Sequence, residues 1–410
     1  MPSIDTDAVL QRIALVAERF KTDALARGQR DALVRTDFDA LAEAGFLRLG
    51  LPAARGGLWH GLAGSARAYG RIIRCLANGD PAVALVASMH PTVLCYWMTT
   101  AEAASDEQAA WTAQREWVFD TVEQGHWWGT LTSEPGSGGD ILRTRTRAEP
   151  VSAAAGSSAA QGAASGDSSA AAQLHYRLSG DKHFGSGSGV ASFMTTTALV
   201  PGHVEPPTLF LDMRNVPWDG STGLTLLHAW DGLGMRATQS HAFRMQRFPA
   251  TCIAATSAAA QARAVLAPMM AVMFGAVALG IVDQAMQWAR ARVAQMSPRA
   301  FEQTEWVRAE NEAWLIAQAY EGAVRAAEQG AGLATSVAAL QAKLCMAELG
   351  EVLLLRLGRV VGGASFSRSQ PLGQWAQDVR ALGFLRPPWG LAVDQLHEAL
   401  KQLHTSAAAR

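Results

Sequence analysis

The chain has 410 residues, of which 49% are hydrophobic and 17% are charged, and its formal net charge is −1. This balance is typical of a folded protein with more than one core, and it excludes disorder over most of the length. A net charge so close to zero gives no basic field, so we expect no nucleic-acid partner and no binding to acidic membranes.

The cysteines and the most apolar segment indicate the compartment. Four cysteines lie far apart, with no neighbouring cysteine or histidine to form a cluster: Cys75, Cys95, Cys252 and Cys345. This spacing favours neither a disulfide framework nor a zinc site, and it fits a cytoplasmic protein. The N-terminus is amphipathic and charged, unlike a signal peptide. The most apolar run, residues 265–282, is interrupted by Pro268 and by glycines, so we expect a buried helix and no membrane span.

Residues 1–126 are expected to form an all-helical domain. Apolar residues recur there at steps of three and four, as at Ile13, Val16 and Phe20, which is typical of a helix with one buried face. The same stepping returns before a glycine-rich break, and a further apolar helix is expected over residues 80–99.

Residues 127–250 change to short runs rich in β-branched and aromatic residues, which Gly, Pro and Asp separate. This pattern predicts an antiparallel β-barrel or sandwich. Within it, residues 152–172 consist almost wholly of Ala, Ser and Gly, so they can bury too little apolar surface to offset the entropy of ordering. We expect a disordered hairpin insertion there, because the Ser and Gly content disfavours an Ala-rich helix.

Residues 251–410 return to helical periodicity. One apolar stripe extends from Met270 to Trp288, and two more long helices are expected over residues 306–329 and 335–357. These segments predict a C-terminal four-helix bundle. The chain as a whole is therefore expected to have an α+β fold, with helices first, a β domain in the middle and a helical bundle last.

Five local motifs, in order along the chain, resemble those of the acyl-CoA dehydrogenase superfamily. They are GFLRLGLPAARGG (residues 45–57), TLTSEPGSGGD (130–140), LSGDKHFGSGSGVASF (178–193), WDGLGMRATQSHAF (230–243) and GRVVGGASF (358–366). The two-component flavin monooxygenases share that superfamily's fold. The resemblance implies a flavin-dependent oxidoreductase that binds FAD, or FMN in the case of a monooxygenase.

The flavin contacts implied by the resemblance lie in the second and third motifs. A flavin ring needs hydrogen bonds along its pyrimidine edge, which a glycine-rich turn can donate, and an apolar face, which phenylalanine can cover. Taken alone, the glycines are better explained by an ordinary β-turn. The implied cofactor contacts are Leu131, Thr132, Ser133, Gly138, Phe184, Gly185 and Ser186, with Gly139 on the substrate side.

The resemblance places the flavin's pyrophosphate near the loop between the first two long bundle helices. Arg299 is the first candidate there and Arg292 the second, although a lone arginine is more often a solvated surface charge. Arg359 suits a phosphate because its guanidinium can donate two parallel hydrogen bonds. Gly362 and Gly363 allow close approach of the backbone to a ligand. The resemblance assigns this last segment to the flavin of a neighbouring subunit.

The base that acyl-CoA dehydrogenation requires is missing from its usual places. A carboxylate must accept the α-proton as hydride leaves for the flavin. Where most family members have this glutamate the sequence has Arg386, and a second family position corresponds to Met270. Arg386 cannot accept a proton, but it can hold an anionic substrate or stabilise an oxyanion. His90 matches a histidine of the monooxygenase branch and, with a reference pKa of about 6.5, is the best remaining base. A structural histidine on a helix face explains His90 equally well.

Three functions therefore stay open. The first is an acyl-CoA dehydrogenase-like, FAD-dependent oxidoreductase acting on acyl-CoA or another small molecule, with an electron-transfer flavoprotein as its partner. The second is a flavin-dependent monooxygenase that receives reduced flavin from a separate reductase. The third is a non-catalytic paralogue that acts as a binding subunit. In each case we expect a homotetramer or homodimer, because so much apolar helix surface is best covered by symmetric association.

Overall fold

The computed structural model describes residues 5–99, 104, 107–151, 175–254 and 259–408. The chain divides into two compact units, and each unit is assembled from separate stretches of sequence. The helical unit contains residues 1–92, 231–239 and 264–410, and the β unit contains residues 93–230 and 240–263. The expected hairpin insertion, residues 152–172, lies outside the described residues.

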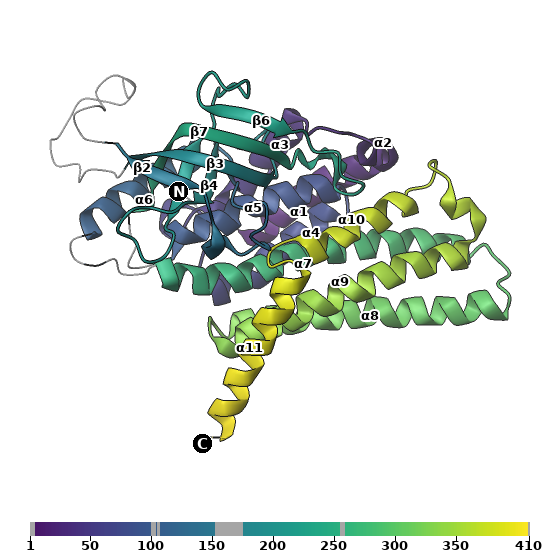
Figure 1. The fold of residues 1–410 in the computed structure, drawn as a ribbon. Helices are drawn as coiled ribbons and strands as arrows, with labels where there is room; N and C mark the ends of the chain where they lie inside the picture. Colours follow the sequence, from purple (N-terminus) through teal and green to yellow (C-terminus); the bar gives the residue numbers. More distant parts are fainter. Residues whose placement is uncertain (1–4, 100–103, 105–106, 152–174, 255–258, 409–410) are drawn as a thin grey trace. The chain divides into compact units, whose positions relative to one another are not determined.

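The β unit is built on a seven-stranded sheet (Figure 1). Its strands are β1 (Trp128–Thr130), β2 (Arg147–Pro150), β3 (His175–Gly185), β4 (Phe193–Thr197), β5 (Thr208–Asp212), β6 (Leu224–His228) and β7 (His241–Cys252). The order across the sheet is β1-β4-β5-β7-β3-β2, and β6 also pairs with β7. The helix α6 (Gln108–Glu123) belongs to the same unit.

The expectation of purely antiparallel strands is wrong at one edge of the sheet. β1 pairs with β4 in parallel, with Trp128 opposite Phe193, whereas the other strand pairs are antiparallel. A parallel pair needs a long connection between its strands. The residues between 131 and 192 supply that connection, and they include the glycine-rich turn.

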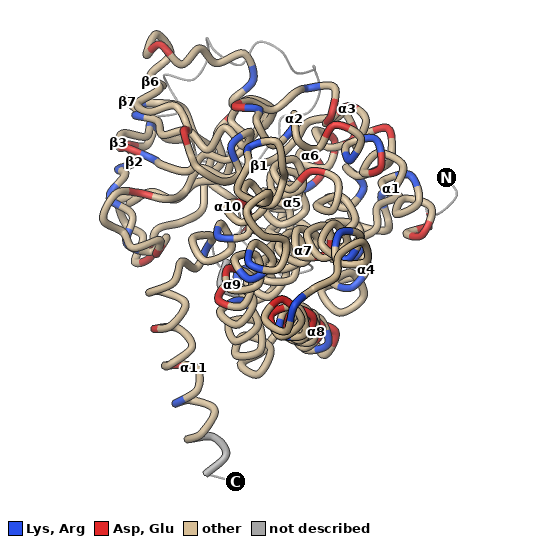
Figure 2. Tube along the Cα trace, turned by 90° about the vertical axis from the view of Figure 1, so that its right-hand side faces the viewer, with Lys and Arg blue, Asp and Glu red and all other residues tan. Residues whose placement is uncertain are grey.

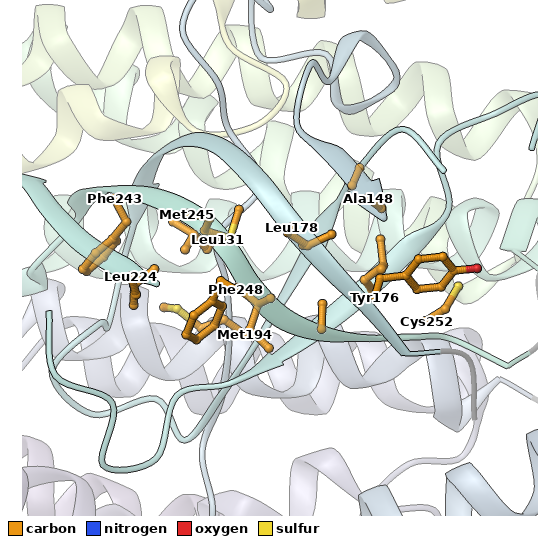
Figure 3. Close-up of a cluster of buried hydrophobic side chains, with 14 of the residues drawn as sticks. Leu131, Ala148, Tyr176, Leu178, Met194, Leu224, Phe243, Met245, Phe248 and Cys252 are labelled. Carbon is orange, nitrogen blue, oxygen red and sulfur yellow. The ribbon is translucent and has the colours of Figure 1, made fainter. Parts of the chain in front are cut away.

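Alternating apolar residues of the strands meet in one core (Figure 3). Tyr176 and Leu178 of β3 lie on the same face as Phe243 and Met245 of β7, since residues two apart in a strand point to the same side. Leu178 and Phe243 are fully buried. Each such side chain contributes about 1.5–3 kcal/mol when it leaves water, which holds the sheet in this register.

The helical unit begins with five helices, of which the last continues into the β unit. They are α1 (Thr6–Thr22), α2 (Ala24–Gly28), α3 (Arg35–Glu43), α4 (Gly61–Ala77) and α5 (Pro81–Met98). α1 buries Ile13, Val16 and Phe20, the residues of the predicted face. The buried Arg27 of α2 donates to Asp37 of α3 and to Asp80, which precedes α5. Ion pairs therefore join α2 to α3 and to the residue that precedes α5.

Five helices complete the helical unit, and the first of them starts in the β unit. They are α7 (Ala259–Val293), α8 (Ala300–Glu328), α9 (Leu333–Val361), α10 (Leu372–Phe384) and α11 (Trp389–Ala408). α8 and α9 lie side by side (Figure 1). Arg356 of α9 bonds to Glu312 and Glu305 of α8 at 2.7 Å each. Charged residues of both signs gather at α8 (Figure 2).

Two glycines let the early helices approach the late ones. A Cβ added at Gly70 of α4 would lie 2.1 Å from the hydroxyl of Tyr320 on α8. A Cβ added at Gly280 of α7 would lie 2.6 Å from Ala77 on α4. The face of α4 therefore depends on α7 and α8, which come much later in the sequence.

Two helices, residues 81–98 and 262–293, are long and apolar enough to span a membrane. Their apolar windows are 89% and 72% buried inside the chain, as in the core helices of a water-soluble protein, so a membrane protein is not indicated. The predicted α+β class, with helices at both ends of a β region, is confirmed.

Candidate functional site

The glycine-rich turn follows β1 directly and is fixed at its start. The Leu131 N–H donates to the Thr195 carbonyl at 2.8 Å, and the Thr196 hydroxyl donates to the Leu131 carbonyl at 2.7 Å. Three glycines of the turn have positive φ, a conformation that side chains disfavour: 75° at Gly136, 63° at Gly138 and 84° at Gly139. These glycines allow the sharp bend of the backbone.

A buried carboxylate within the turn, Glu134, connects it to β3 and to residues 144–146. Glu134 accepts hydrogen bonds from the Lys182 ammonium at 2.5 Å and from the Thr146 hydroxyl at 2.7 Å. The Arg145 N–H at 2.5 Å and the Thr144 hydroxyl donate to it as well. Burial alone would raise the pKa of Glu134, but Lys182 and these hydrogen bonds outweigh it and lower the pKa to about 2. Glu134 is therefore ionised and structural.

The second predicted flavin segment lies beside the first. The His183 N–H donates to the Ser133 carbonyl at 2.8 Å, which joins the end of β3 to the turn. Phe184 follows at a bulge with φ of 56°, and its ring is 57% exposed. The ring centroid lies 6.0 Å from that of Trp230. A strained, exposed aromatic residue at this point is more typical of a binding surface than of a core.

The two segments fit the flavin that the sequence motifs imply. The N–H groups of Thr132 and Gly138 donate to no other group in the described chain. A Cβ added at Gly138 would meet nothing within 4 Å, so a ligand can approach the backbone there. Ser186 adds a hydroxyl, which lies 2.7 Å from that of Ser240. Together these groups offer backbone donors and a flat apolar ring, as a flavin requires.

Comparison with known proteins identifies the architecture. No protein-family model and no curated protein sequence matches the chain. Among solved structures, KijD3 in complex with dTDP has a TM-score of 0.76 at 20% identity, over 98% of this chain and 97% of that one. FMN-bound TdsC from Paenibacillus sp. A11-2 has a TM-score of 0.73 at 17% identity, over 95% and 96%. Methanesulfinate monooxygenase MsuC from Pseudomonas fluorescens has a TM-score of 0.70 at 20% identity, over 96% and 97%. The chain has the acyl-CoA dehydrogenase fold.

Two of the three arginines that the sequence resemblance places near a pyrophosphate have side-chain partners in the protein. Arg299 precedes α8, and its backbone N–H donates to Glu302 at 2.9 Å. Arg292 stacks on the Trp288 ring at 3.7 Å. Arg359 reaches Glu305 at 3.3 Å, and its side chain is 60% exposed. Arg359 therefore keeps an accessible face, and its pyrophosphate role stays a prediction.

Gly362 and Gly363 end α9. Gly362 has φ of 82°, and a Cβ added at either glycine would meet nothing within 4 Å. Space for a close backbone approach is present at both positions, and their role toward a neighbouring subunit's flavin stays a prediction. Gly139, expected on the substrate side, donates its N–H to the Ser137 hydroxyl at 3.2 Å.

His90 lies in the core of the acyl-CoA dehydrogenase fold. It is fully buried in α5, and burial lowers its pKa to about 3 despite a hydrogen bond with the Leu47 backbone. The pKa near 6.5 that we expected from the sequence is therefore wrong for this residue. Arg386 follows α10 and is partly buried, as is Met270 in α7. Neither position carries a carboxylate.

Sequence reasoning missed two features of the site. Lys182, the buried partner of Glu134, has the same parity along β3 as the buried Leu178, and this inward position was the available signal. The second is His241, which is buried and whose Nδ1 accepts from the Trp230 N–H at 2.9 Å. Across the described residues, no group of three or more His, Cys, Asp or Glu side chains could hold a metal ion.

Proposed function

We propose that this protein is a flavin-dependent monooxygenase that uses FMN supplied in reduced form by a separate reductase. One observation carries the proposal. The turn after β1 and the exposed Phe184 offer a surface suited to a flavin, whereas the carboxylate of that turn is unsuited to accept a proton. Glu134, the carboxylate of the turn, is held by Lys182 with a pKa of about 2. By the sequence resemblance, Arg386 and Met270 stand where members of the superfamily carry their catalytic glutamate.

The neighbours support FMN and oxygen chemistry. TdsC was crystallised with FMN and is named a dibenzothiophene monooxygenase, and MsuC is named a methanesulfinate monooxygenase. KijD3 was crystallised with FMN and a dTDP-linked amino sugar. These chains match almost the whole length of this one, which supports a related chemistry on a small-molecule substrate.

In this proposal each residue of the turn has a simple task. Thr132 and Gly138 donate their N–H groups to the polar edge of the ring, and Phe184 covers one of its faces. Ser133 and Ser186 add hydroxyls at the same edge. When bound, reduced flavin supplies the electrons that activate molecular oxygen, so that one oxygen atom enters the substrate.

The sequence resemblance implies that His90 and Arg386 lie near the reaction, and we propose a limited role for each. With a pKa of about 3, His90 is neutral at pH 7, so it can orient a group by hydrogen bonding but carries no proton between steps. Arg386 is a permanent cation, which suits an anionic substrate or an oxyanion. The alternative, an FAD-dependent acyl-CoA dehydrogenase coupled to an electron-transfer flavoprotein, needs a carboxylate base that neither residue provides.

We further propose a cytoplasmic homo-oligomer, either dimer or tetramer. Arg359, Gly362 and Gly363 would then serve the flavin of a neighbouring subunit, as the sequence resemblance implies. Exposed apolar side chains on α8 and α9 supply a surface for association, including Val307, Trp314 and Leu355, each at least 60% exposed.

The test is a set of flavin titrations of the purified protein, with FMN and FAD in both redox states and anaerobically for the reduced forms. We expect reduced FMN to bind most tightly, and acyl-CoA to leave the flavin spectrum unchanged. Ser133→Ala with Ser186→Ala should weaken binding, each lost hydrogen bond being worth about 0.5–1.5 kcal/mol. Ser221→Ala, on an exposed loop of the same unit, is the control.

Two results would contradict the proposal. Tightly bound FAD that bleaches on addition of acyl-CoA would favour the dehydrogenase. Failure to bind any flavin state would favour a non-catalytic paralogue.

A further inference from the structure

The helical unit contains a polar cavity of about 510 Å³ that is built from residues other than those placed at the flavin. Its walls come from α2, from the first turn of α5, from residues 236–237, from α7 and from the segment that leads into α10. The Arg27–Asp80 ion pair forms one wall. Asp80 is already occupied there, because it accepts from Arg27 at 2.7 Å and from the Val83 N–H at 3.0 Å.

One end of the cavity is suited to an anion. α10 has 13 residues, and Pro371 at its N-cap supplies no side-chain cap, so its first-turn N–H groups point outward without a side-chain acceptor. Gly373 lies in this turn, and a Cβ added there would meet nothing within 4 Å. Arg368 lines the same end, and no described residue forms an ion pair with it. These are the two elements of a phosphate site, a bare helix N-terminus and a free guanidinium.

A second, independent feature calls for a hydrogen-bond donor. Gln284 of α7 lines the cavity and is only 8% exposed, and its Oε1 atom is buried without a hydrogen-bond partner. A buried carbonyl oxygen left without a donor is costly, on the order of 1–3 kcal/mol. A ligand that brings a hydroxyl to this atom would remove that cost.

Asp378 of α10 lines the same cavity. α10 contacts α7 where the Trp288 and Trp375 rings lie 6.1 Å apart. Asp378 Oδ1 accepts from the Met235 N–H at 2.6 Å and from the Gln374 amide at 2.9 Å. Burial raises the pKa of Asp378 to about 7, so near neutral pH a large fraction of it is uncharged and does not repel an anion.

We propose that this cavity binds a phosphorylated polyhydroxy compound, with the phosphate at Arg368 and the first turn of α10 and a hydroxyl donated to Gln284. The volume suits a sugar phosphate, since ligand pockets begin at roughly 300 Å³. The proposal does not rest on the monooxygenase activity. The phosphate could belong to a separate substrate or to the ribityl phosphate of FMN, and the test separates these sources.

The test is isothermal titration calorimetry of the full chain with ribose 5-phosphate, inorganic phosphate and ribose. Arg368→Gln should weaken both phosphate-containing ligands about tenfold or more, because a charge-assisted hydrogen bond is lost. Gln284→Met should weaken ribose 5-phosphate about fivefold and leave inorganic phosphate unchanged. Arg380→Gln removes an exposed arginine of α10 that does not line the cavity, and it should leave both affinities unchanged.

A competition with FMN identifies the source of the phosphate. If FMN displaces ribose 5-phosphate, the cavity holds the flavin's own phosphate. If both bind together, the cavity serves a separate phosphorylated compound. The proposal is overturned if the wild type binds no ribose 5-phosphate at millimolar concentration, or if Arg380→Gln weakens binding as much as Arg368→Gln does.

Discussion

Lys182 and Glu134 form a buried ion pair, with 2.5 Å between Nζ and Oε1, directly beneath the turn proposed to hold the flavin. Their side chains are 0% and 4% exposed. Lys182 also donates to the Thr197 carbonyl at 2.7 Å, so the pair connects β3, β4 and the turn. A charge in such a place is tolerable only while its partner is present.

Replacing Glu134 by Gln should lower the free energy of unfolding by about 3–5 kcal/mol, because Lys182 is left as an uncompensated buried charge. Urea denaturation of the two proteins measures the difference. Glu149→Gln breaks the exposed pair with Arg247 and should change stability by less than about 1 kcal/mol. Equal effects of the two substitutions would contradict a buried, structural role for Glu134.

The same pair predicts acid sensitivity. The folded-state pKa of Glu134 is lowered to about 2, so its contribution to stability is full above its ordinary pKa of 4.5. That contribution should be lost as the pH falls from about 4.5 to about 2. As the pH is lowered from 6 to 3, the urea midpoint should therefore fall more steeply for the wild type than for Glu134→Gln. Parallel pH profiles would show that the pair does not supply the acid sensitivity.

Two substitutions of Phe184 distinguish a role in binding flavin from a role in stability. Its positive φ is strained for any residue except glycine, by on the order of 1 kcal/mol. Phe184→Gly should therefore be more stable than Phe184→Ala by about that amount, while both lose flavin affinity because the ring is gone. Thermal unfolding and flavin titration of the two variants test this. Flavin binding that survives both substitutions would remove Phe184 from the site.

Asp378 should make stability fall between acid and neutral pH. Its folded-state pKa is raised from 3.8 to about 7, so its favourable contribution is full below about 3.8 and is lost as the pH rises through about 7. Asp378→Asn keeps an oxygen acceptor for Met235 and Gln374 and should flatten the dependence between pH 4 and 8. Asp394→Asn, which replaces an exposed aspartate of α11, should leave the dependence as it is. A wild-type profile that rises over this range would have the wrong sign.

Trp314 offers a test of association. It is 62% exposed on α8. Leu315 is its neighbour in sequence, and Val307 lies on the same face of the helix. Trp314→Glu should shift the proposed oligomer toward monomers, because a charge is costly in an apolar interface. Leu15→Glu makes the same kind of change at a 70% exposed position of α1 and should leave the mass unchanged. Multi-angle light scattering gives the masses, and a monomeric wild type would rule out the oligomer.

Local patterns predicted the elements of this fold better than their pairing. The apolar stripe from Met270 to Trp288 lies within α7, as predicted. Such a helix can be predicted because the apolar residues of one helical face are three and four positions apart. The parallel pairing of β1 with β4 was missed, since no short-range signal distinguishes it from an antiparallel pair. Motif order implied that residues 131–133 and 184–186 share a site, and the structure shows that a hydrogen bond from His183 to Ser133 joins the two segments.

Burial and charge at the site could not be predicted from single residues. A histidine's pKa depends on the side chains that surround it, and the 0% exposure of His90 follows from helices distant in sequence. The Glu134–Lys182 pair joins residues 48 positions apart, so the local sequence around either residue does not indicate its partner. Gln284 could not be predicted either. It lies on an apolar helix, and only the folded structure shows that its Oε1 atom is buried without a hydrogen-bond partner.

The interleaving of the two units has a consequence for biosynthesis. α4 packs against α7 and α8 through Gly70 and Gly280, yet residues 93–263 must leave the ribosome between them. At about 5–20 residues per second, that interval lasts on the order of ten to thirty seconds. During this time the nascent N-terminal helices expose an apolar face with no native partner, which chaperones must shield. A chain that terminates before α8 therefore leaves this face of α4 without part of its native partner.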